Sequence, residues 1–543
     1  MMMGTAVLTG TTSCVSDLDQ YPHTETTSKD VYTSLANYEA VLGKIYAAMV
    51  TSGQGKGGDN KDMESVLNNG SGFDYMRMFI NMQECGTDEF ASTWLTGEQT
   101  TGLTYLSWDA NDAWVSDMYY RIYYNIALCN EFLRNANSAS FSGADAEKMK
   151  EYKAEVRFMR ALFYYHALDF YRNIPMVTEN DPVGSYIPPR YTPQQTFDYI
   201  ESELKDCVGD MLPASTCPYG QASQGAAYTL LAKLYLNSEV YTGVAKYAEC
   251  KEACEKVMNM GYSLESDYSK LFNADNDKRT NEIIFALPVS AEHTVSWGSS
   301  TYLICGQVSM SNANQNVADY GVTAGWSEFR LRPEFVDKFS QTDIDGNGDK
   351  RCKFFTNGQS KDVTSMTDET SGYLSEKWSN LKDDKTTASN TADAGVETDF
   401  PLFRLADVYL MYAECVVRTG GDWDNWAGGS DAESDSRKKG AIYWINKVRE
   451  RAYGKGKGQV WSSNFANDDA FLQFILDERA RELYHEGYRR TDLIRYGQFT
   501  TNKYIWQWKG GTHDGQAVDS KYNIYPIPNT ELTANPNLHN DNY

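Results

Sequence analysis

The stretch Phe400-Pro-Leu-Phe-Arg-Leu-Ala-Asp-Val-Tyr-Leu-Met-Tyr-Ala-Glu-Cys415 carries apolar residues at helical spacing. Leu405, Val408 and Tyr412 follow one another at intervals of three and four positions. This pattern is typical of an amphipathic helix that packs one face against other helices. The sequence therefore predicts a helix over 403–419.

The same spacing recurs along the chain, for example at Val156 and Met159. Two neighbouring segments, 223–237 and 244–260, predict a helix pair, with small residues such as Ala227 where the backbones approach closely. Such a pair is the unit of a tetratricopeptide-like repeat. Helices are also expected over 34–50, 113–136, 147–172, 193–209, 437–451 and 468–485.

Two regions lack this periodicity and are rich in Gly, Ser and Asn: 52–72 and about 262–400. The sequence predicts a mostly α fold, with a tetratricopeptide-like helical scaffold over about 34–261 and 403–497 and a large, irregular, loop-rich elaboration between them. Long loops are commonly functional. We therefore expect a single domain whose ligand-binding region is about 262–400.

The charge balance excludes some partners. The 543 residues include 50 Lys and Arg against 74 Asp and Glu, a net charge of −24, and contain no Lys- or Arg-rich run. Nucleic acids and anionic lipid headgroups both attract basic surfaces. Neither is expected to bind.

The N-terminal segment predicts a lipoprotein signal. The apolar run Ala6-Val-Leu8 precedes Thr11-Thr-Ser-Cys14 and is far too short to span a bilayer. Cleavage of residues 1–13 would leave Cys14 as the lipidated terminus, and the missing basic segment suggests that the true start lies upstream. A frayed polar tail is the alternative.

The other nine cysteines are an odd number without a close Cys-x-x-Cys pair, so we expect free thiols. Cys250 and Cys254, four apart on a predicted helix, are the alternative as a metal pair, although packing residues are favoured.

Two later segments extend the opening stretch into an ordered signature: Asp477-Glu-Arg-Ala-Arg-Glu-Leu-Tyr-His-Glu-Gly-Tyr-Arg-Arg-Thr-Asp-Leu-Ile-Arg495, then Tyr525-Pro-Ile-Pro528 with Asn535-Pro-Asn-Leu538. In this order the three resemble the SusD/RagB family of outer-membrane lipoproteins, which capture glycans for nutrient uptake by a TonB-dependent, SusC-like transporter. The resemblance implies a lipid-anchored, non-catalytic protein at the cell surface of a Gram-negative bacterium.

A saccharide site needs flat aromatic rings beside a few polar partners. Trp94, Tyr302 and Trp326 stand beside Gly, Ser and Thr, a context that predicts rings at the surface. The chain is similar to the starch-binding founder of the family over nearly its whole length. That similarity implies that these rings form an arc along an α-glucan and that Arg77 binds hydroxyl groups.

One founder residue is not carried over. Gly97 stands where the founder has a glycan-binding asparagine, three residues after Trp94, so Glu98 or Gln99 is expected to supply that hydrogen bond. The difference leaves the exact glucan open. The 52–72 loop, which also differs, is expected to close over the ligand.

Calcium is a further expectation. A loop with Asp343, Asp345, Asn347 and Asp349 resembles the first half of a calcium loop, but Phe354 stands where the bidentate glutamate belongs. The loop equally resembles a short Asp/Gly turn. A second candidate pair is Asp275 with Asp277, since the founder holds calcium.

Two other classes of function remain open. A repeat scaffold that binds a peptide or partner protein, as in the RagB branch, would be favoured if Trp94 and Trp326 were buried beneath loops. A surface glycoside hydrolase would need two acids about 5–10 Å apart in a cleft. The chain has no match to a hydrolase triad, a phosphate loop or a dinucleotide fingerprint, so no enzyme is expected.

Overall fold

The computed structural model describes residues 28–55, 62–63, 66–67, 73–390, 395–424 and 439–543. Nine helices of the scaffold lie where the periodicity predicts them, with ends that differ by a few residues. They are α2 (Leu35–Ala47), α5 (Ala113–Ser138), α6 (Ala144–Tyr171), α7 (Pro193–Cys207), α8 (Gln224–Leu236), α10 (Tyr247–Met258), α14 (Leu405–Arg418), α15 (Ala441–Tyr453) and α16 (Asp468–Leu483).

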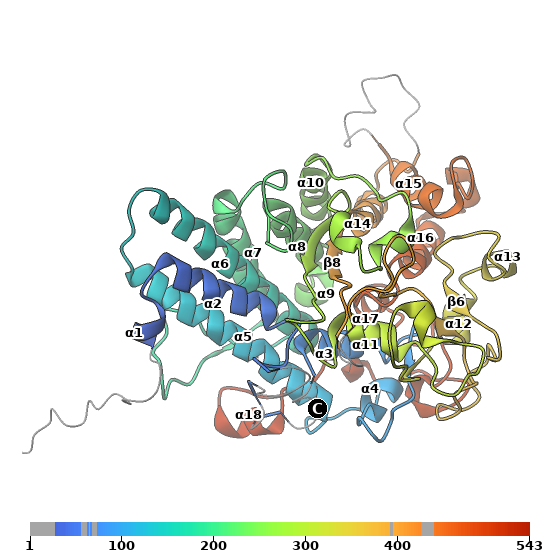
Figure 1. Cartoon of the computed structure of the whole chain (residues 1–543), viewed down its shortest axis with the longest axis horizontal. Coiled ribbons are helices and arrows are strands. Elements are labelled where there is room, and N and C mark those ends of the chain that lie inside the picture. The colour runs from blue at the N-terminus through green and yellow to red at the C-terminus, as the bar shows by residue number, and fades with distance from the viewer. Residues whose placement is uncertain (1–27, 56–61, 64–65, 68–72, 391–394, 425–438) are drawn as a thin grey trace, which may run out of the picture.

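These helices pack in a continuous series. Helix α5 packs on α6, α6 on α7, α8 on α10 and α10 on α14, which in turn contacts α15 and α16. Figure 1 shows α2, α5, α6 and α7 side by side at one end of the molecule, with α14, α15 and α16 beyond α8 and α10. The predicted mostly α, tetratricopeptide-like fold is therefore confirmed.

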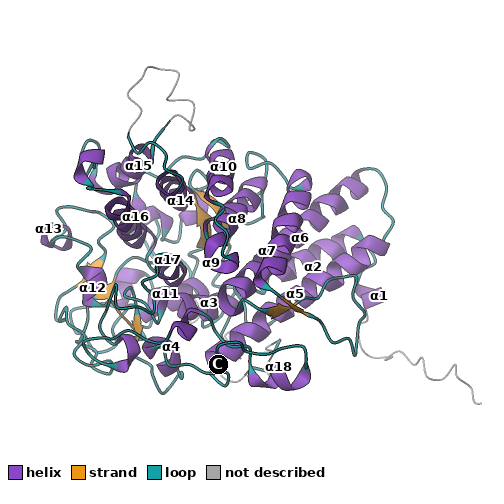
Figure 2. Ribbon diagram, turned by 180° about the vertical axis from the view of Figure 1, so that it is seen from behind, coloured by secondary structure: helices purple, strands orange, loops and turns teal. Residues whose placement is uncertain are grey.

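Shorter helices fill the rest of the described chain. They are α1 (Ser28–Val31), α3 (Tyr75–Glu84), α4 (Thr101–Tyr105), α9 (Ser238–Thr242), α11 (Ser299–Gly306), α12 (Pro333–Val336), α13 (Gln341–Ile344), α17 (Arg489–Arg495) and α18 (Asn529–Ala534). Figure 2 shows long loops around α11, α12 and α13 at the end of the molecule opposite α6.

The few strands form two-stranded antiparallel sheets. The longest pair joins β4 (Ile283–Leu287) to β8 (Phe400–Arg404) and is buried throughout. The other pairs are β1 (Ala91–Ser92) with β5 (Phe329–Arg330), β2 (Ile174–Pro175) with β3 (Arg190–Tyr191), and β6 (Phe354–Phe355) with β7 (Leu374–Ser375). The opening stretch is therefore a strand followed by a helix, and the helix expected from 403 begins at Leu405.

The cysteine expectation is confirmed for the described chain, in which all nine cysteines are free thiols and most are buried. Among the described helices, none is both long and apolar enough to cross a bilayer.

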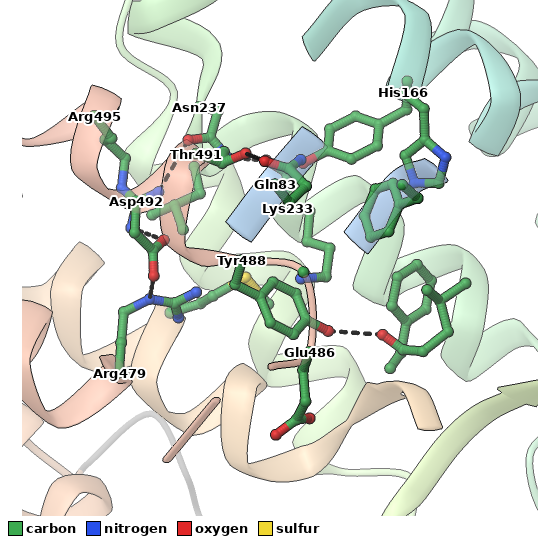
Figure 3. Close-up of a pocket in the computed structure, with 17 residues that line it drawn as sticks. Gln83, His166, Lys233, Asn237, Arg479, Glu486, Tyr488, Thr491, Asp492 and Arg495 are labelled. Carbon is green, nitrogen blue, oxygen red and sulfur yellow. Dashed lines mark hydrogen bonds and ion pairs between the residues drawn. The ribbon is translucent and has the colours of Figure 1, made fainter. Parts of the chain in front are cut away.

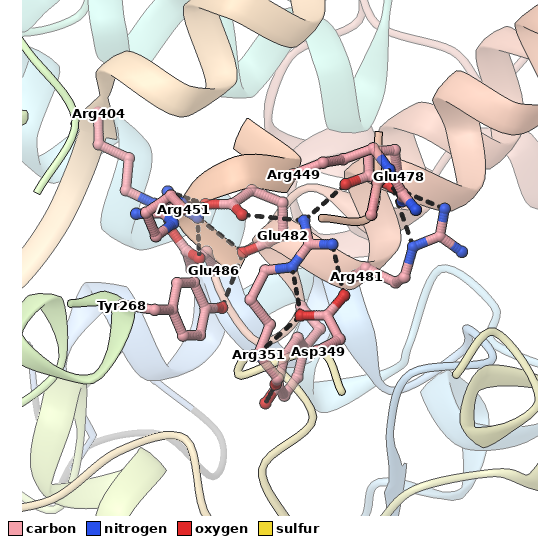
Figure 4. Close-up of polar contacts among 12 residues, drawn as sticks. Tyr268, Asp349, Arg351, Arg404, Arg449, Arg451, Glu478, Arg481, Glu482 and Glu486 are labelled. Atoms are coloured by element: carbon pink, nitrogen blue, oxygen red, sulfur yellow. Dashed lines mark hydrogen bonds and ion pairs between the residues drawn. The ribbon is translucent and has the colours of Figure 1, made fainter. Parts of the chain in front are cut away.

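A buried network of charges joins the scaffold to the elaboration (Figure 4). Glu482 on α16 accepts hydrogen bonds from Arg404 (2.5 Å), from Arg351 (3.1 Å) and from Arg451. All four side chains are essentially closed to solvent. Glu478, one turn earlier on α16, binds Arg351 at 2.8 Å.

Burial acts to raise the pKa of Glu482, but the three guanidinium groups outweigh it and hold the pKa at about 2. The carboxylate is therefore charged at neutral pH. A buried charge is tolerated when opposite charges and hydrogen bonds surround it.

We predict that Glu482→Gln lowers the apparent free energy of unfolding by about 3–5 kcal/mol, because it leaves buried guanidinium groups short of one negative charge. Urea unfolding followed by circular dichroism measures the change. Glu252→Gln, which alters an exposed carboxylate on α10, is the control and should change stability by less than about 0.5 kcal/mol.

The same experiment has a pH signature. The folded pKa lies below the ordinary 4.5, so the carboxylate stabilises the fold above that pH and loses this effect as the pH falls toward 2. The difference between wild type and Glu482→Gln should shrink over that interval. A difference that stays constant from pH 6 to pH 3 would show that ionisation of Glu482 contributes no stability.

Candidate functional site

The candidate site is built on α3, which carries Arg77. The sequence analysis did not single out this helix, although its residues have amphipathic spacing, and in the structure all ten of them are buried. Asp74 caps the helix, and its carboxylate accepts a hydrogen bond from the Arg77 backbone N–H at 2.8 Å. Arg77 was expected to bind a ligand at the surface, yet its side chain is only 2% exposed.

The Arg77 guanidinium is held by acceptors from three other segments. It donates to the Trp297 carbonyl oxygen at 2.7 Å, to Glu328 at 3.2 Å and to Glu98. Burial acts to lower the pKa of Arg77, but Glu328 and Glu98 outweigh it and raise it. Glu98, expected as a substitute for the missing asparagine, is thus already bound to Arg77.

Aromatic rings surround the same guanidinium. The Arg77 Cζ atom lies 3.9 Å from the ring centroid of Phe73, 4.1 Å from that of Tyr302 and 5.9 Å from that of Trp326. Cation–π contacts of this kind fix both the charge and the rings. Arg77 therefore lies directly against the rings of Phe73, Tyr302 and Trp326.

The expected surface position of Tyr302 is wrong. Tyr302 lies on α11, is fully buried, and packs against Phe329 at 4.8 Å between ring centroids. Its hydroxyl lies 2.5 Å from the Asn81 amide oxygen and 2.8 Å from Glu328, to either of which it can donate. The neighbouring Gly and Ser residues indicated a loop, but they belong to a buried helix.

Trp297, which the sequence analysis did not single out, takes the partly exposed position that we expected for Tyr302. Its ring lies 6.0 Å from that of Trp326. Trp297 is half-buried, whereas Trp326 is 8% exposed, so the expectation of an exposed Trp326 ring is also wrong. The missed signal was local, since Trp297 is followed by Gly298 and Ser299 much as Trp326 is flanked by Gly and Ser.

Strand pairing brings the chain at Trp94 beside the turn that carries Trp326. It follows β1, and the Thr93 backbone N–H donates to the Glu328 carbonyl at 2.9 Å, so the chain at Trp94 runs beside Ser327. The Trp94 ring is half-buried, as expected of a ring at the surface. Gln99, which follows the Trp94 turn, is exposed.

The backbone is strained where it carries these residues. Gln99, Ser299 and Ser327 have φ values of 57°, 49° and 53°, in the left-handed region that residues other than glycine rarely adopt. Each such residue costs about 1–3 kcal/mol, and such strain clusters at functional sites. Each lies within two residues of Glu98, Trp297 or Trp326.

Glycines permit the close packing behind the rings. A Cβ atom on Gly298 would lie 2.1 Å from an Asp74 carboxylate oxygen, and one on Gly325 would lie 2.7 Å from the Val308 carbonyl oxygen. Both positions therefore require glycine.

The calcium candidates have other partners. Asp343 accepts from the Asp349 backbone N–H at 2.6 Å, and Asp349 pairs with Arg351 at 2.6 Å. Asp275 pairs with Lys278. In the described ranges no three His, Cys, Asp or Glu side chains group as metal ligands. Asp345 and Asp277 complete no such group in these ranges.

Two expectations fall on residues that the structure does not describe. Cys14 lies outside the described residues, and so does most of the 52–72 loop.

A small cavity is lined in part by the signature segment 477–495 (Figure 3). Its volume is about 40 Å³, and Lys233, Arg479 and Tyr488 are among the residues that line it. A water molecule needs only about 10–15 Å³ of such space. The cavity has room for a few waters and is too small for a sugar ring.

Comparison with known proteins identifies the family. A sequence model of the SusD family matches residues 353–543, and one described as starch-binding and associating with the outer membrane matches residues 18–236. The starch-binding protein SusD of Bacteroides thetaiotaomicron is 33% identical over 97% of this chain and 95% of that protein. This chain belongs to the SusD family.

Other SusD-family proteins are more distant. A SusD-like protein of Bacteroides ovatus is 23% identical over 83% of this chain and 79% of that protein. A SusD-like carbohydrate-binding protein of Bacteroides fragilis has a TM-score of 0.70 at 18% identity, covering 94% of this chain and all of that one. Surface glycan-binding protein A of Bacteroides thetaiotaomicron, solved with laminarihexaose, has a TM-score of 0.66 at 17% identity, with coverages of 94% and 99%. These structures share the fold.

We predict that Tyr302→Phe destabilises the protein by about 1–3 kcal/mol, because buried Asn81 and Glu328 lose a donor that water cannot replace. Urea unfolding measures the loss. Tyr228→Phe alters a half-buried ring in the scaffold and serves as the control. Equal stability of Tyr302→Phe and wild type would mean that the hydroxyl makes no net contribution at this position.

Proposed function

We propose that this SusD-family protein captures an α-glucan, such as starch or a malto-oligosaccharide, at the cell surface and passes it to a transporter. The observation that carries the proposal is the pairing of the Trp297 and Trp326 rings beside the fixed Arg77 guanidinium, with the chain at Trp94 running alongside Ser327. Flat rings offer the apolar faces on which pyranose rings stack. The name of the SusD relative supports starch as the glucan.

The geometry favours preorganised binding. The rings stand on strained turns, and Arg77 is held by three acceptors and three rings, so little side-chain freedom is left to lose when a ligand binds. Gln99 has an exposed amide beside the Trp94 turn and is the residue we assign to hydrogen bonding in place of the founder's asparagine. Arg77 acts chiefly by positioning the rings.

The site can also account for release. Each stacked sugar adds only a small binding free energy, and association carries a substantial entropic cost. Binding should therefore be weak and reversible, as delivery to a transporter requires. We propose attachment to the outer membrane through lipidated Cys14 and a TonB-dependent, SusC-like partner, both of which follow from the family resemblance.

We predict that Trp94→Ala, Trp297→Ala and Trp326→Ala each weaken binding of maltoheptaose or β-cyclodextrin by about tenfold, equivalent to about 1.4 kcal/mol. Isothermal calorimetry and affinity electrophoresis in amylopectin gels measure this. Trp461→Ala, in which an exposed tryptophan outside the site is removed, is the control. Tyr302→Phe, which keeps its ring, should bind normally.

Selective binding of xylan or levan in place of α-glucan would retain the site and reject starch as its ligand. Undiminished α-glucan binding by all three tryptophan variants would reject the site itself.

A peptide or partner protein is the second candidate. Of the two rings whose burial would favour it, Trp326 is buried and Trp94 is half-buried. It would be supported if no glycan binds and if a peptide library is retained by wild type but not by Trp94→Ala.

The proposed function is non-catalytic, and the binding proteins among the relatives support this. We predict no release of reducing sugar from starch, pullulan or dextran during overnight incubation with purified protein. Release that disappears when buried Glu328 is replaced by Gln would establish a hydrolase instead.

A further inference from the structure

A cleft lies apart from Trp94, Trp297 and Trp326. It opens between the 3-10 turns Tyr268–Leu271 and Val317–Tyr320, the strands β6 and β7, and the loop at 379–385. Its volume is about 430 Å³. That is enough space for a sugar-sized ligand.

Lysines are concentrated around this cleft. Five lysines and four acidic residues line it, although the whole chain has far more acids than bases. Lys353, Lys382 and Lys385 make no side-chain hydrogen bond or ion pair with any residue in the described ranges. Lys382 and Lys385 are exposed at the rim, and Lys382 attracts Asp384 only at longer range.

Two of the acidic residues are already bound by neighbours. Asp383 accepts from Asn273 at 2.9 Å and pairs with Arg279. Glu376 accepts from the Tyr320 hydroxyl at 2.7 Å.

The other two acids lie at the exposed rim, Asp267 as the cap of a 3-10 turn and Asp319 on the Val317–Tyr320 turn. Asp383 is therefore paired with a cation, whereas Glu376 has only a neutral hydrogen-bond donor, and the three ammonium groups have no ion-pair partner in the described ranges.

The floor of the cleft carries a buried ion pair. Lys377 is only 3% exposed, and its Nζ atom binds Glu486 at 2.6 Å and the Tyr484 carbonyl oxygen. At the rim, Lys385 has a φ of 68°, in the tight turn that is closed by the hydrogen bond from the Lys382 backbone N–H to the Thr386 carbonyl oxygen.

We propose that this cleft binds a small anion of sugar size, through a carboxylate or phosphate group held by Lys353, Lys382 and Lys385. The two sources of that chemistry are an acidic sugar, such as a uronic acid or a sugar phosphate, and free phosphate. The proposal is independent of the α-glucan site. It gives the protein a second, charge-selective site.

The test measures binding of galacturonate, glucose 6-phosphate, inorganic phosphate and glucose to the purified protein by calorimetry or ligand-observed nuclear magnetic resonance. We expect millimolar binding of the anions, no binding of glucose, and weakening as sodium chloride is raised from 20 to 300 mM, because salt screens exposed charges. Lys382→Ala with Lys385→Ala should weaken anion binding about tenfold.

Two matched variants isolate the cleft. Lys455→Ala with Lys457→Ala removes the same charge from an exposed turn after α15 and should leave binding unchanged. Lys382→Arg with Lys385→Arg should retain it. Trp94→Ala should not change anion binding. This variant therefore distinguishes failure of the anion-site proposal from failure of the α-glucan proposal.

Binding of inorganic phosphate alone would assign free phosphate as the ligand, and binding of galacturonate or glucose 6-phosphate above phosphate would assign an acidic sugar. The proposal is overturned if no anion binds at 10 mM, if glucose binds equally well, or if the Lys382 and Lys385 alanine variant binds like wild type.

Discussion

The buried Glu482 carboxylate contacts three guanidinium groups and so joins distant segments of this chain. Glu482 belongs to α16 of the scaffold, whereas Arg351 comes from the loop-rich region, Arg404 from the end of β8 and Arg451 from α15. A buried ion loses its hydration, so such a group is tolerated only when every partner is in place. The loop-rich region is therefore held against the scaffold by ion pairs, and these ion pairs are stable only when Glu482 and its three arginines are all in place.

This arrangement reaches the candidate site through the signature segment. Immediately after Glu482 the chain turns at Gly487, whose backbone N–H donates to Glu84 at 2.7 Å, at the end of α3. Gly487 has a φ of 84°, and a Cβ atom there would lie 2.4 Å from the Phe79 ring. Helix α3 is held against the signature by this close approach. The position of Arg77 at the other end of α3 thus depends on residues more than 400 positions away in sequence.

The scaffold was predictable because its helices have one apolar face, as α10 and α14 show. Helix α11 was not, because it is buried on all sides and its residues show little amphipathic periodicity. Helix α3 was missed although its spacing is amphipathic, since it is short and follows directly on the Gly- and Asn-rich segment 52–72. Local context placed Trp94 correctly and misplaced Tyr302, since Gly and Ser beside an aromatic residue occur both at exposed turns and in tightly packed helices. The close packing of Trp297 against Trp326 depends on contacts between distant segments. Sequence context could have nominated Trp297 but could not have paired the two rings.

The left-handed backbone conformations of Ser299 and Ser327, beside the tryptophan rings, lower the stability of the whole fold. Glycine at Ser299 or Ser327 would relieve local strain and could stabilise the fold, yet it would also free the turn that aims the adjacent tryptophan. A variant selected only for thermal stability would therefore hold its tryptophan rings in less well-defined positions. In this protein, the backbone torsions of Ser299 and Ser327 affect both the stability of the fold and the specificity of ligand binding.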